Sequence, residues 1–297
     1  MTYNSPNAAD HHPTSRGSDE ALEVASITLV LGEIGASESG YHIFNDPKQP
    51  FQRSITVDHQ RGVLEARCRS REVVHGRLFS DSEEDATLLV YDISLDTTKR
   101  SRRITKATVE FEFRNSKVDG EAPRVHALAP EGRERCLLSN QEETVTYKTE
   151  GTLEAGPVSI VNAGLTVGME KMTATNVRDD ARVTGGTFCD KSGYDRESGA
   201  RWRLTENPTS KSGVPSHLRC AILLAREDNT LFEAKVTIKL EADWKSELGR
   251  RLAATSPPDD PVLFNPKAEP TNMLCKTGYD TQNLGRVDLQ GFVSIRD

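Results

Sequence analysis

The chain has 297 residues, of which 28% are charged, and carries a formal net charge of −7 at pH 7. This length can bury a substantial core, either in one large β domain or in two ordinary ones. The acidic balance argues against a nucleic-acid binder, because such proteins need a positive surface to displace counterions from phosphates. The one dense basic run, KRSRR at residues 99–103, is better explained as a solvated turn.

The first 22 residues are polar and predict a flexible tail. They lack the basic and apolar regions of a signal peptide, and no apolar run approaches the ~20 residues that cross a bilayer. These features predict a soluble cytoplasmic protein and make a membrane partner unlikely. The five cysteines agree, since an odd, scattered set without a CxxC pair favours free thiols.

Hydrophobic residues then recur with period two from about residue 24 to about residue 241. The clearest segments are 232–241 and 104–114, where apolar residues alternate with Glu, Lys, Thr and Arg. This pattern is typical of antiparallel strands with one wet face. Because such strands must pair their apolar faces, the predicted fold class is mainly β, an antiparallel β-sandwich. It is either one large sandwich or two in series, which would then cover residues 23–150 and 151–254.

One short helix is predicted near the C-terminus, over residues 243–254. Trp244, Leu248 and Leu252 fall on one helical face, and Asp243 is placed to cap the start. The prolines that follow forbid a regular helix or a central strand, so residues 255–297 are predicted to form an extended arm. Its apolar patch, which includes Phe264, either docks on the body or binds a partner.

Residues 201–226 combine two predicted strands with a long loop. The alternation of the first strand places Trp202 inward and both Arg201 and Arg203 outward, while LRCAILLAR is a continuous apolar run that predicts a central strand covered on both faces. The loop between them, residues 207–216, is longer than a tight hairpin needs, and long ordered loops often carry function. The residues predicted to bind a ligand are Trp202, Arg201, Arg203, Lys211, Ser212, His217 and Phe264.

The sequence carries no complete catalytic or metal-binding motif. Ser212 and His217 lie close in sequence, but an activated serine needs a base within reach and a third group that orients the base. The chain has no HExxH, no Cys/His pair at zinc spacing, no EF-hand loop and no GxxxxGK phosphate loop. We therefore predict no metal and no cofactor, and assign no catalytic residue.

Four segments resemble a group of uncharacterised proteins from filamentous fungi. They are DTTKRSRRITKATVEFEFR, HALAPEG, RWRLTENPTSKSGVPSHLRCAILLAR and PVLFNPKAEPTN. The resemblance covers most of the chain from about residue 24. It implies a fungal intracellular protein and nothing about its mechanism.

Three functions remain open from the sequence. The absence of a catalytic signature favours a non-enzymatic β-sandwich module that recognises a protein or a small-molecule ligand through the loop at 207–216 and the arm. The alternative is a small-molecule enzyme with a cavity between the sheets. A second alternative is a pore-forming protein, since residues 159–188 alternate and are rich in Gly, Ala, Thr and Ser, as in hairpins that form membrane barrels. Exposed edge strands also make a homodimer plausible.

Overall fold

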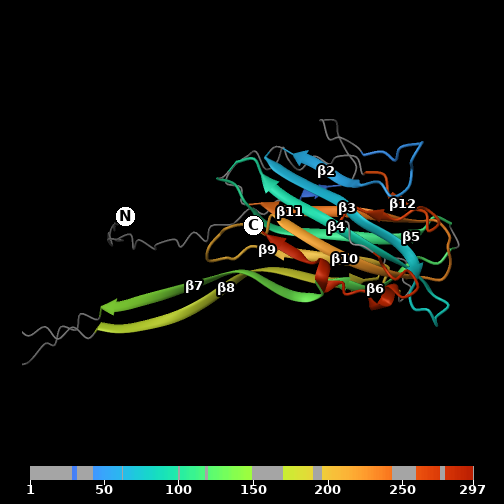
Figure 1. Ribbon diagram of the computed structural model, residues 1–297. Helices are drawn as coiled ribbons and strands as arrows, with labels where there is room; N and C mark the ends of the chain where they lie inside the picture. Colours follow the sequence, from blue (N-terminus) through green and yellow to red (C-terminus); the bar gives the residue numbers. More distant parts are fainter. Residues whose placement is uncertain are drawn as a thin grey trace, which may run out of the picture.

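The computed structural model shows a mainly β protein built from two antiparallel sheets (Figure 1). It describes residues 29–31, 43–61, 63–99, 101–117, 120–148, 170–189, 196–242, 259–274 and 278–296, with the backbone alone at 29–31, 61, 136–148 and 170–179. The helices in this part of the chain are two 3-10 turns, η1 (Leu284–Arg286) and η2 (Gln290–Phe292). The predicted sandwich is therefore confirmed, whereas the helix predicted at 243–254 lies outside the described residues.

The first sheet has the order β1-β11-β5-β9-β8-β7, and β12 pairs with β11. Every pairing in it is antiparallel. Its strands are β1 (Leu29–Leu31), β5 (Ile104–Asn115), β7 (Gly132–Lys148), β8 (Glu170–Phe188), β9 (Gly199–Thr205), β11 (Phe232–Ala242) and β12 (Val262–Phe264).

The second sheet has the order β13-β3-β4-β10-β14, with β2 pairing with β3 and β6 pairing with β10. It too is antiparallel throughout. Its strands are β2 (Ile55–Arg61), β3 (Leu64–Arg77), β4 (Asp85–Thr97), β6 (Arg124–Ala129), β10 (His217–Arg226), β13 (Thr271–Asn272) and β14 (Ser294–Arg296).

The main core lies between the two sheets. Tyr91 of β4 meets Phe111 of β5 with ring centroids 4.7 Å apart, and Phe111 packs edge-on against Trp202 of β9 at 5.9 Å. The alternating apolar residues of both strands are buried: Ala107, Val109, Phe111 and Phe113 of β5, and Ala234, Ile238 and Leu240 of β11. Period-two alternation therefore identified which face of these strands is inward.

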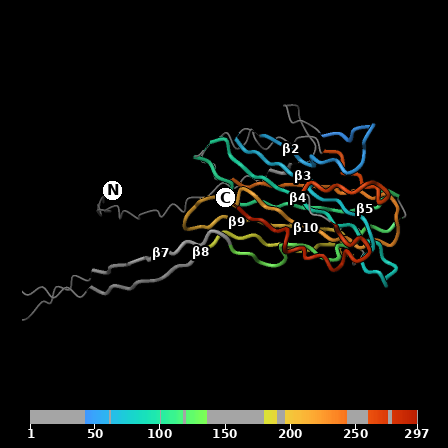
Figure 2. Tube along the Cα trace, viewed as in Figure 1, coloured from blue at the N-terminus to red at the C-terminus, as the bar shows by residue number. Residues whose placement is uncertain are grey.

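The strand β10 is covered on both faces, as its continuous apolar run predicts. Leu218 and Ile222 belong to the main core, whereas Ala221 and Leu223 belong to a second cluster on the other face of the sheet. Residues of the C-terminal segment, including Leu284 and Phe292, close that second cluster. Figure 2 shows this segment, in red, running beside β10.

Strands from both sides of residue 150 share each sheet. In the first sheet β5 lies between β9 and β11, and in the second β4 lies beside β10. The described strands thus form one large sandwich, the first of the two forms left open above. The described part of the C-terminal arm docks on this body, because β12, β13 and β14 pair with β11, β3 and β10.

The cysteines with described side chains carry free thiols: Cys68 and Cys220 are buried and Cys189 is exposed. Burial raises the pKa of the Cys68 and Cys220 thiols, so both stay protonated and unreactive at neutral pH. In the described part of the chain, no helix combines the length and apolar character that crossing a membrane requires.

Candidate functional site

The structure does not bring the seven predicted binding residues together. Trp202 and Phe264 are fully buried. The indole Nε1 of Trp202 donates a hydrogen bond to the carbonyl oxygen of Pro130 at 3.0 Å, and the ring of Phe264 stacks on Phe232 at 4.8 Å. Both side chains therefore act as core residues in this structure and present no surface to a ligand.

The arginines Arg201 and Arg203 lie on the outward face of β9, as predicted. The Nε of Arg201 donates to Glu110 at 2.6 Å, and its guanidinium carbon lies 4.4 Å from the centroid of the Phe188 ring. Burial alone would raise the pKa of Glu110, but hydrogen bonds and charge from Lys239 and Arg201 outweigh it and hold the pKa below its usual value. Arg203 is exposed.

The loop at 207–216 is ordered by bonds within the chain. The side-chain oxygen of Asn207 accepts from the backbone N–H groups of Thr209 and Ser210 at 2.9 and 3.1 Å. Ser212 shares a 3.1 Å hydrogen bond with the hydroxyl of Ser210, and Lys211 adopts a positive φ of 48°. The loop thus presents exposed Lys211 and Ser212 on a fixed backbone, and its role in recognition stays a prediction.

His217 begins β10 on the second sheet, with its Nε2 3.7 Å from the buried carboxylate of Asp92. Two arginines hold that carboxylate: Nε of Arg71 at 2.6 Å and Nε of Arg219 at 2.6 Å. Burial raises the pKa of Asp92, but the hydrogen bonds and charges of the two arginines together lower it below its usual value. Asp92 is therefore charged at neutral pH and fixes both guanidinium groups.

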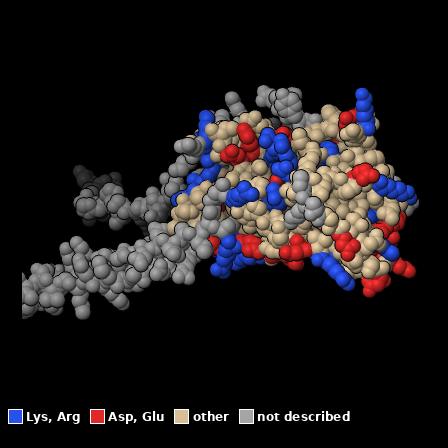
Figure 3. Space-filling view, in the orientation of Figure 1, with Lys and Arg blue, Asp and Glu red and all other residues tan. Residues whose placement is uncertain are grey.

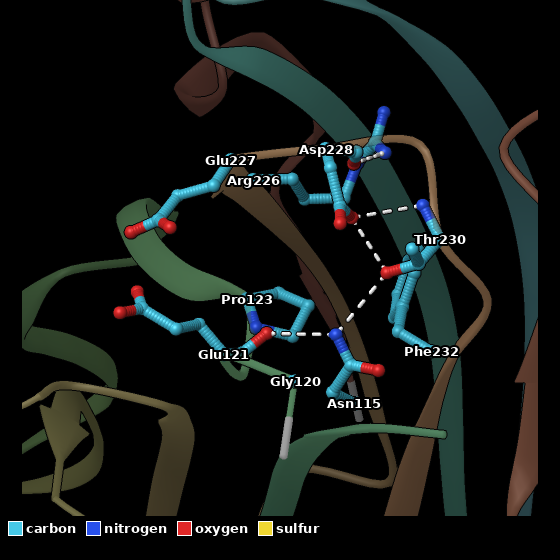
Figure 4. A pocket seen from close by; sticks show the side chains of 9 residues that line it. All are labelled: Asn115, Gly120, Glu121, Pro123, Arg226, Glu227, Asp228, Thr230 and Phe232. Carbon is cyan, nitrogen blue, oxygen red and sulfur yellow. Dashed lines mark hydrogen bonds between the residues drawn. The ribbon is translucent and has the colours of Figure 1, made fainter. Parts of the chain in front are cut away.

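A hollow with a cavity volume of about 210 Å³ lies beside the turn that joins β10 to β11 (Figure 4). The side chains around it bind one another: the amide nitrogen of Asn115 donates to Glu121 O and Thr230 Oγ1, and the Thr230 hydroxyl donates to Asp228.

Arg226, at the wall of this hollow, gives its donors to Thr87 Oγ1, Ala86 O and Asp228 O, at 2.7 to 3.1 Å. Burial lowers its pKa to about 10. With its charged group committed to the protein, the hollow offers little to a substrate. None of Arg201, Trp202, Arg203 and His217 lines it, so these predicted binding residues do not meet in this hollow.

The strongest candidate is a hairpin formed by β7 and β8. The two strands pair from Gly132 opposite Gly185 to Lys148 opposite Glu170. The next strand of the sheet, β9, reaches β8 only from Arg182 to Phe188. Residues 170–181 of β8 therefore pair with β7 alone among the described strands, and the two strands run beyond the sandwich as a ribbon (Figure 1).

The base of the hairpin is anchored tightly to the sandwich. At Gly185 the chain passes so close to its neighbours that a Cβ atom would lie 1.9 Å from Pro130 O and 2.7 Å from Trp202 Nε1. On the same strand the buried carboxylate of Asp180 accepts two hydrogen bonds from Arg182, at 2.8 and 3.0 Å. The contact at Gly185 therefore fixes the base of the hairpin to the sandwich, whereas the bonds between Asp180 and Arg182 lie within β8.

The sequence between the two strands, residues 149–169, alternates in polarity. Odd-numbered positions carry most of its apolar residues, among them Leu153, Leu165 and Val167, whereas Glu and Thr fall mainly at even positions. The sequence prediction placed the membrane hairpin at residues 159–188, a range that includes β8 but not β7. The register of the structure, in which Lys148 pairs with Glu170, shows that β7 and β8 form one long hairpin.

Comparisons with known proteins give no family. No protein-family model and no curated protein matches the chain. Among solved structures it is similar to Clostridium perfringens delta-toxin, with a TM-score of 0.27 and 11% identity over 72% of this chain and 94% of that one. It is also similar to the Clostridium perfringens NetB toxin in its membrane-inserted form, with a TM-score of 0.26 and 9% identity over 70% and 86% of the two chains. At these TM-scores neither similarity bears on what this chain does.

Proposed function

We propose that this chain is a pore-forming protein that inserts the β7–β8 hairpin into a membrane, where hairpins from several copies close a barrel. The observation that carries the proposal is the ribbon itself, which leaves the sandwich with no third strand, among those the structure describes, beside residues 170–181 of β8. The enzyme and recognition hypotheses gain no comparable feature from the geometry.

The outer edges of such a ribbon carry backbone groups that have no strand to pair with in water. A two-stranded hairpin is marginally stable alone, and each of its outer edges offers unpaired N–H and C=O groups. Pairing with the hairpins of neighbouring copies satisfies both edges, and closure into a barrel removes them altogether. A ribbon of this length thus favours assembly, and a bilayer is the setting in which a closed barrel is required.

The dimensions of the hairpin suit a bilayer. A tilted strand needs about 9–11 residues to cross the hydrocarbon layer. β7 has 17 residues and β8 has 19, and the sequence that joins them continues the alternation that barrels use to separate the lipid face from the lumen. Thr, Gly, Asn and Glu occupy the even positions between the two strands except for Val158 and Ile160, as a water-filled interior would favour.

The sandwich can persist while the hairpin inserts. The main core joins residues of β3, β4 and β10 to residues of β5, β9 and β11. Burial of Trp202 beneath Gly185 holds the base of the hairpin to the body. The body therefore acts as a rigid support from which the hairpin extends.

Dye release from sealed vesicles tests the proposal. The full chain is added to vesicles of neutral phosphatidylcholine and to vesicles that also contain phosphatidylglycerol. Its matched control replaces residues 141–177 with Asn-Gly, which joins Asn140 to Arg178 where the register already pairs them and closes a two-residue hairpin turn. We expect release by the full chain and none by the shortened one.

Thermal unfolding of both chains completes the design. The shortened chain should keep its melting temperature within a few degrees, so that lost release reports on the hairpin. Equal release by both chains, or no release by the full chain from either kind of vesicle, contradicts the proposal.

A further inference from the structure

The outward face of the second sheet is divided into two halves. The half around Ala221 and Leu223 of β10 is covered by the C-terminal segment. The other half lies beyond that segment, at the strand ends where His217 of β10 pairs with Arg296 of β14. Its residues are set by register, since residues directly opposite each other on neighbouring strands share a face.

Two rows of side chains cross this uncovered half. In one row Arg296, His217, Ser94 and Arg67 face one another across β14, β10, β4 and β3; in the next row the residues are Ser294, Arg219, Asp92 and Arg69. The inward residues between the rows, Leu218, Ile93 and Cys68, belong to the main core, which confirms that the rows point outward. We call Arg67, Arg69, Arg71, Arg219 and Arg296 the arginine face.

Among the described residues, this half of the sheet holds five arginines and four carboxylates, because Glu65 of β3 and Asp96 of β4 face each other in the next row. Asp92 is shared by Arg71 and Arg219, and Asp58 lies 3.0 Å from Arg67. Among the described residues, no carboxylate lies within ion-pair distance of Arg69 or Arg296, and both are exposed. Figure 3 shows Lys and Arg atoms gathered over the part of this surface between β3 and the C-terminus.

Part of the arginine face is already ordered for binding. The 2.6 Å hydrogen bonds to Asp92 fix the guanidinium groups of Arg71 and Arg219. A bulge between Ser70 and Glu72 supplies Arg71 as an extra residue directed at the same carboxylate. Within the described structure, Arg71 donates to Asp92 through its Nε alone. Most of its five N–H donors therefore remain available to another oxyanion.

The spacing suits an array of oxyanions rather than one buried ligand. Neighbouring strands lie about 4.8 Å apart, so the backbones at Arg219 and Arg69, two strands apart, are about 10 Å from each other. The surface is the flat face of a sheet, open to solvent, and its guanidinium groups bind phosphate oxygens in a planar, two-point geometry. A bilayer surface presents phosphates in such an array.

We propose that the arginine face binds the phosphate groups of anionic membrane lipids and so brings the chain to its target membrane. The choice of lipid over free phosphate rests on the proposed pore-forming function. The net charge of −7 makes the effect local, since charges farther away than about 8–10 Å are screened at physiological salt.

Vesicle flotation tests binding separately from dye release. The full chain is mixed with neutral phosphatidylcholine vesicles or with vesicles that contain phosphatidylglycerol, and the bound fraction is measured at low and at physiological salt. Arg69→Gln and Arg296→Gln are the test variants because neither residue holds Asp92. Arg203→Gln, an exposed arginine on the outward face of the first sheet, is the matched control.

We expect binding to the anionic vesicles only, weakened about fivefold by each test variant and further by salt, since an arginine at an anionic surface contributes on this order. The control should bind like the original chain. Equal binding to neutral vesicles, or equal loss in Arg203→Gln, overturns the proposal. A third outcome also overturns it: the chain binds neither kind of vesicle, yet millimolar inorganic phosphate raises its melting temperature. The ligand is then a soluble oxyanion.

The two proposals fail in different ways. The chain shortened at residues 141–177 keeps the arginine face, so it should still float with anionic vesicles. Binding to anionic vesicles without dye release removes the pore and keeps the arginine face. Release from neutral and anionic vesicles alike, with equal binding to both, keeps the pore and removes the arginine face.

Discussion

At the scale of single residues, two adjacent glycines of β8 show how closely the hairpin is fitted to the body. Gly185 lies against Pro130 and the ring of Trp202, with no room for a Cβ atom. Gly186, the next residue, has nothing within 4 Å of the position where its Cβ would be. Alternation along the strand explains the contrast, since one residue faces the body and the next faces away.

Gly185→Ala should destabilise the protein by about 3 kcal/mol, because the added methyl must displace backbone at Pro130 or the buried indole. Gly186→Ala should stay within about 1 kcal/mol of the original chain, on the stabilising side, since it only restricts the unfolded chain. Urea unfolding monitored by tryptophan fluorescence gives both values. Similar stabilities for the two variants would show that the hairpin base is not packed as described.

A second feature at this scale is the half-buried imidazole of His75. Its Nδ1 lies 2.9 Å from Thr87 Oγ1 and its Nε2 lies 2.7 Å from the amide nitrogen of Gln52. Burial, assisted by the charge of Arg226, lowers its pKa from 6.5 to about 4. The folded protein therefore keeps His75 neutral at pH values where the unfolded chain would already bind a proton.

This difference in pKa predicts a loss of stability as the pH falls. Between pH 6.5 and pH 4 the unfolded chain binds the extra proton, so the free energy of unfolding decreases over that window and is fully retained above it. The shift corresponds to about 3 kcal/mol. Between pH 7 and pH 4, the free energy of unfolding of the variant His75→Gln should therefore fall by about 3 kcal/mol less than that of the original chain. Urea unfolding at each pH measures both. Parallel pH profiles would contradict the assignment.

At the scale of elements, sequence patterns predicted individual strands better than their pairing. Alternation identified β5, β9 and β11 with their inward faces, and the continuous apolar run identified β10 as covered on both faces. The order β11-β5-β9-β8 could not be predicted, because it joins segments far apart in the chain. For the same reason the sequence could not predict that Asp92 binds Arg219, which lies 127 residues later in the chain, as well as Arg71. The seven predicted binding residues do not converge, because Trp202 and Phe264 face inward and the outward arginines of β9 lie on a different sheet from His217 of β10.

A prediction for the hairpin depends only on whether a residue has an odd or an even number, because alternate residues of a strand face opposite sides. If odd positions between β7 and β8 meet lipid, an arginine there should block insertion, since it costs about 2–4 kcal/mol at the centre of a bilayer. Leu153→Arg should therefore abolish dye release, while Thr152→Arg, one residue earlier, should leave it nearly unchanged. Both variants should float with anionic vesicles. Equal release by the two would rule out a barrel with this alternation.

At the scale of the whole molecule, the C-terminal segment completes the body rather than extending from it. Leu284, Leu289 and Phe292 cover the second apolar cluster on the outward face of β10. Glu72 of β3 accepts hydrogen bonds from the backbone N–H of Leu274 and the hydroxyl of Tyr279, at 2.7 and 3.1 Å. The arm predicted from its prolines is therefore part of the architecture.

Deleting residues 278–297 should expose this cluster and abolish cooperative unfolding, with increased binding of a hydrophobic dye. Deleting residues 1–22, the predicted tail, is the control and should change the melting temperature by no more than a few degrees. Scanning calorimetry of the two shortened chains tests the comparison. A sharp, cooperative transition in the chain that lacks 278–297 would mean that the body folds without its C-terminal cover.

The pairing of β14 with β10 also sets the order of folding during synthesis. Residues 294–296 lie opposite 217–219, so β14 completes one side of β10, a strand made about 80 residues earlier. β7 and β8 leave the ribosome before β9, the strand that anchors them to the body. A nascent chain therefore carries the hairpin without its anchor until β9 has emerged, and an open edge on β10 until β14 has emerged. This interval is when the chain most needs a chaperone.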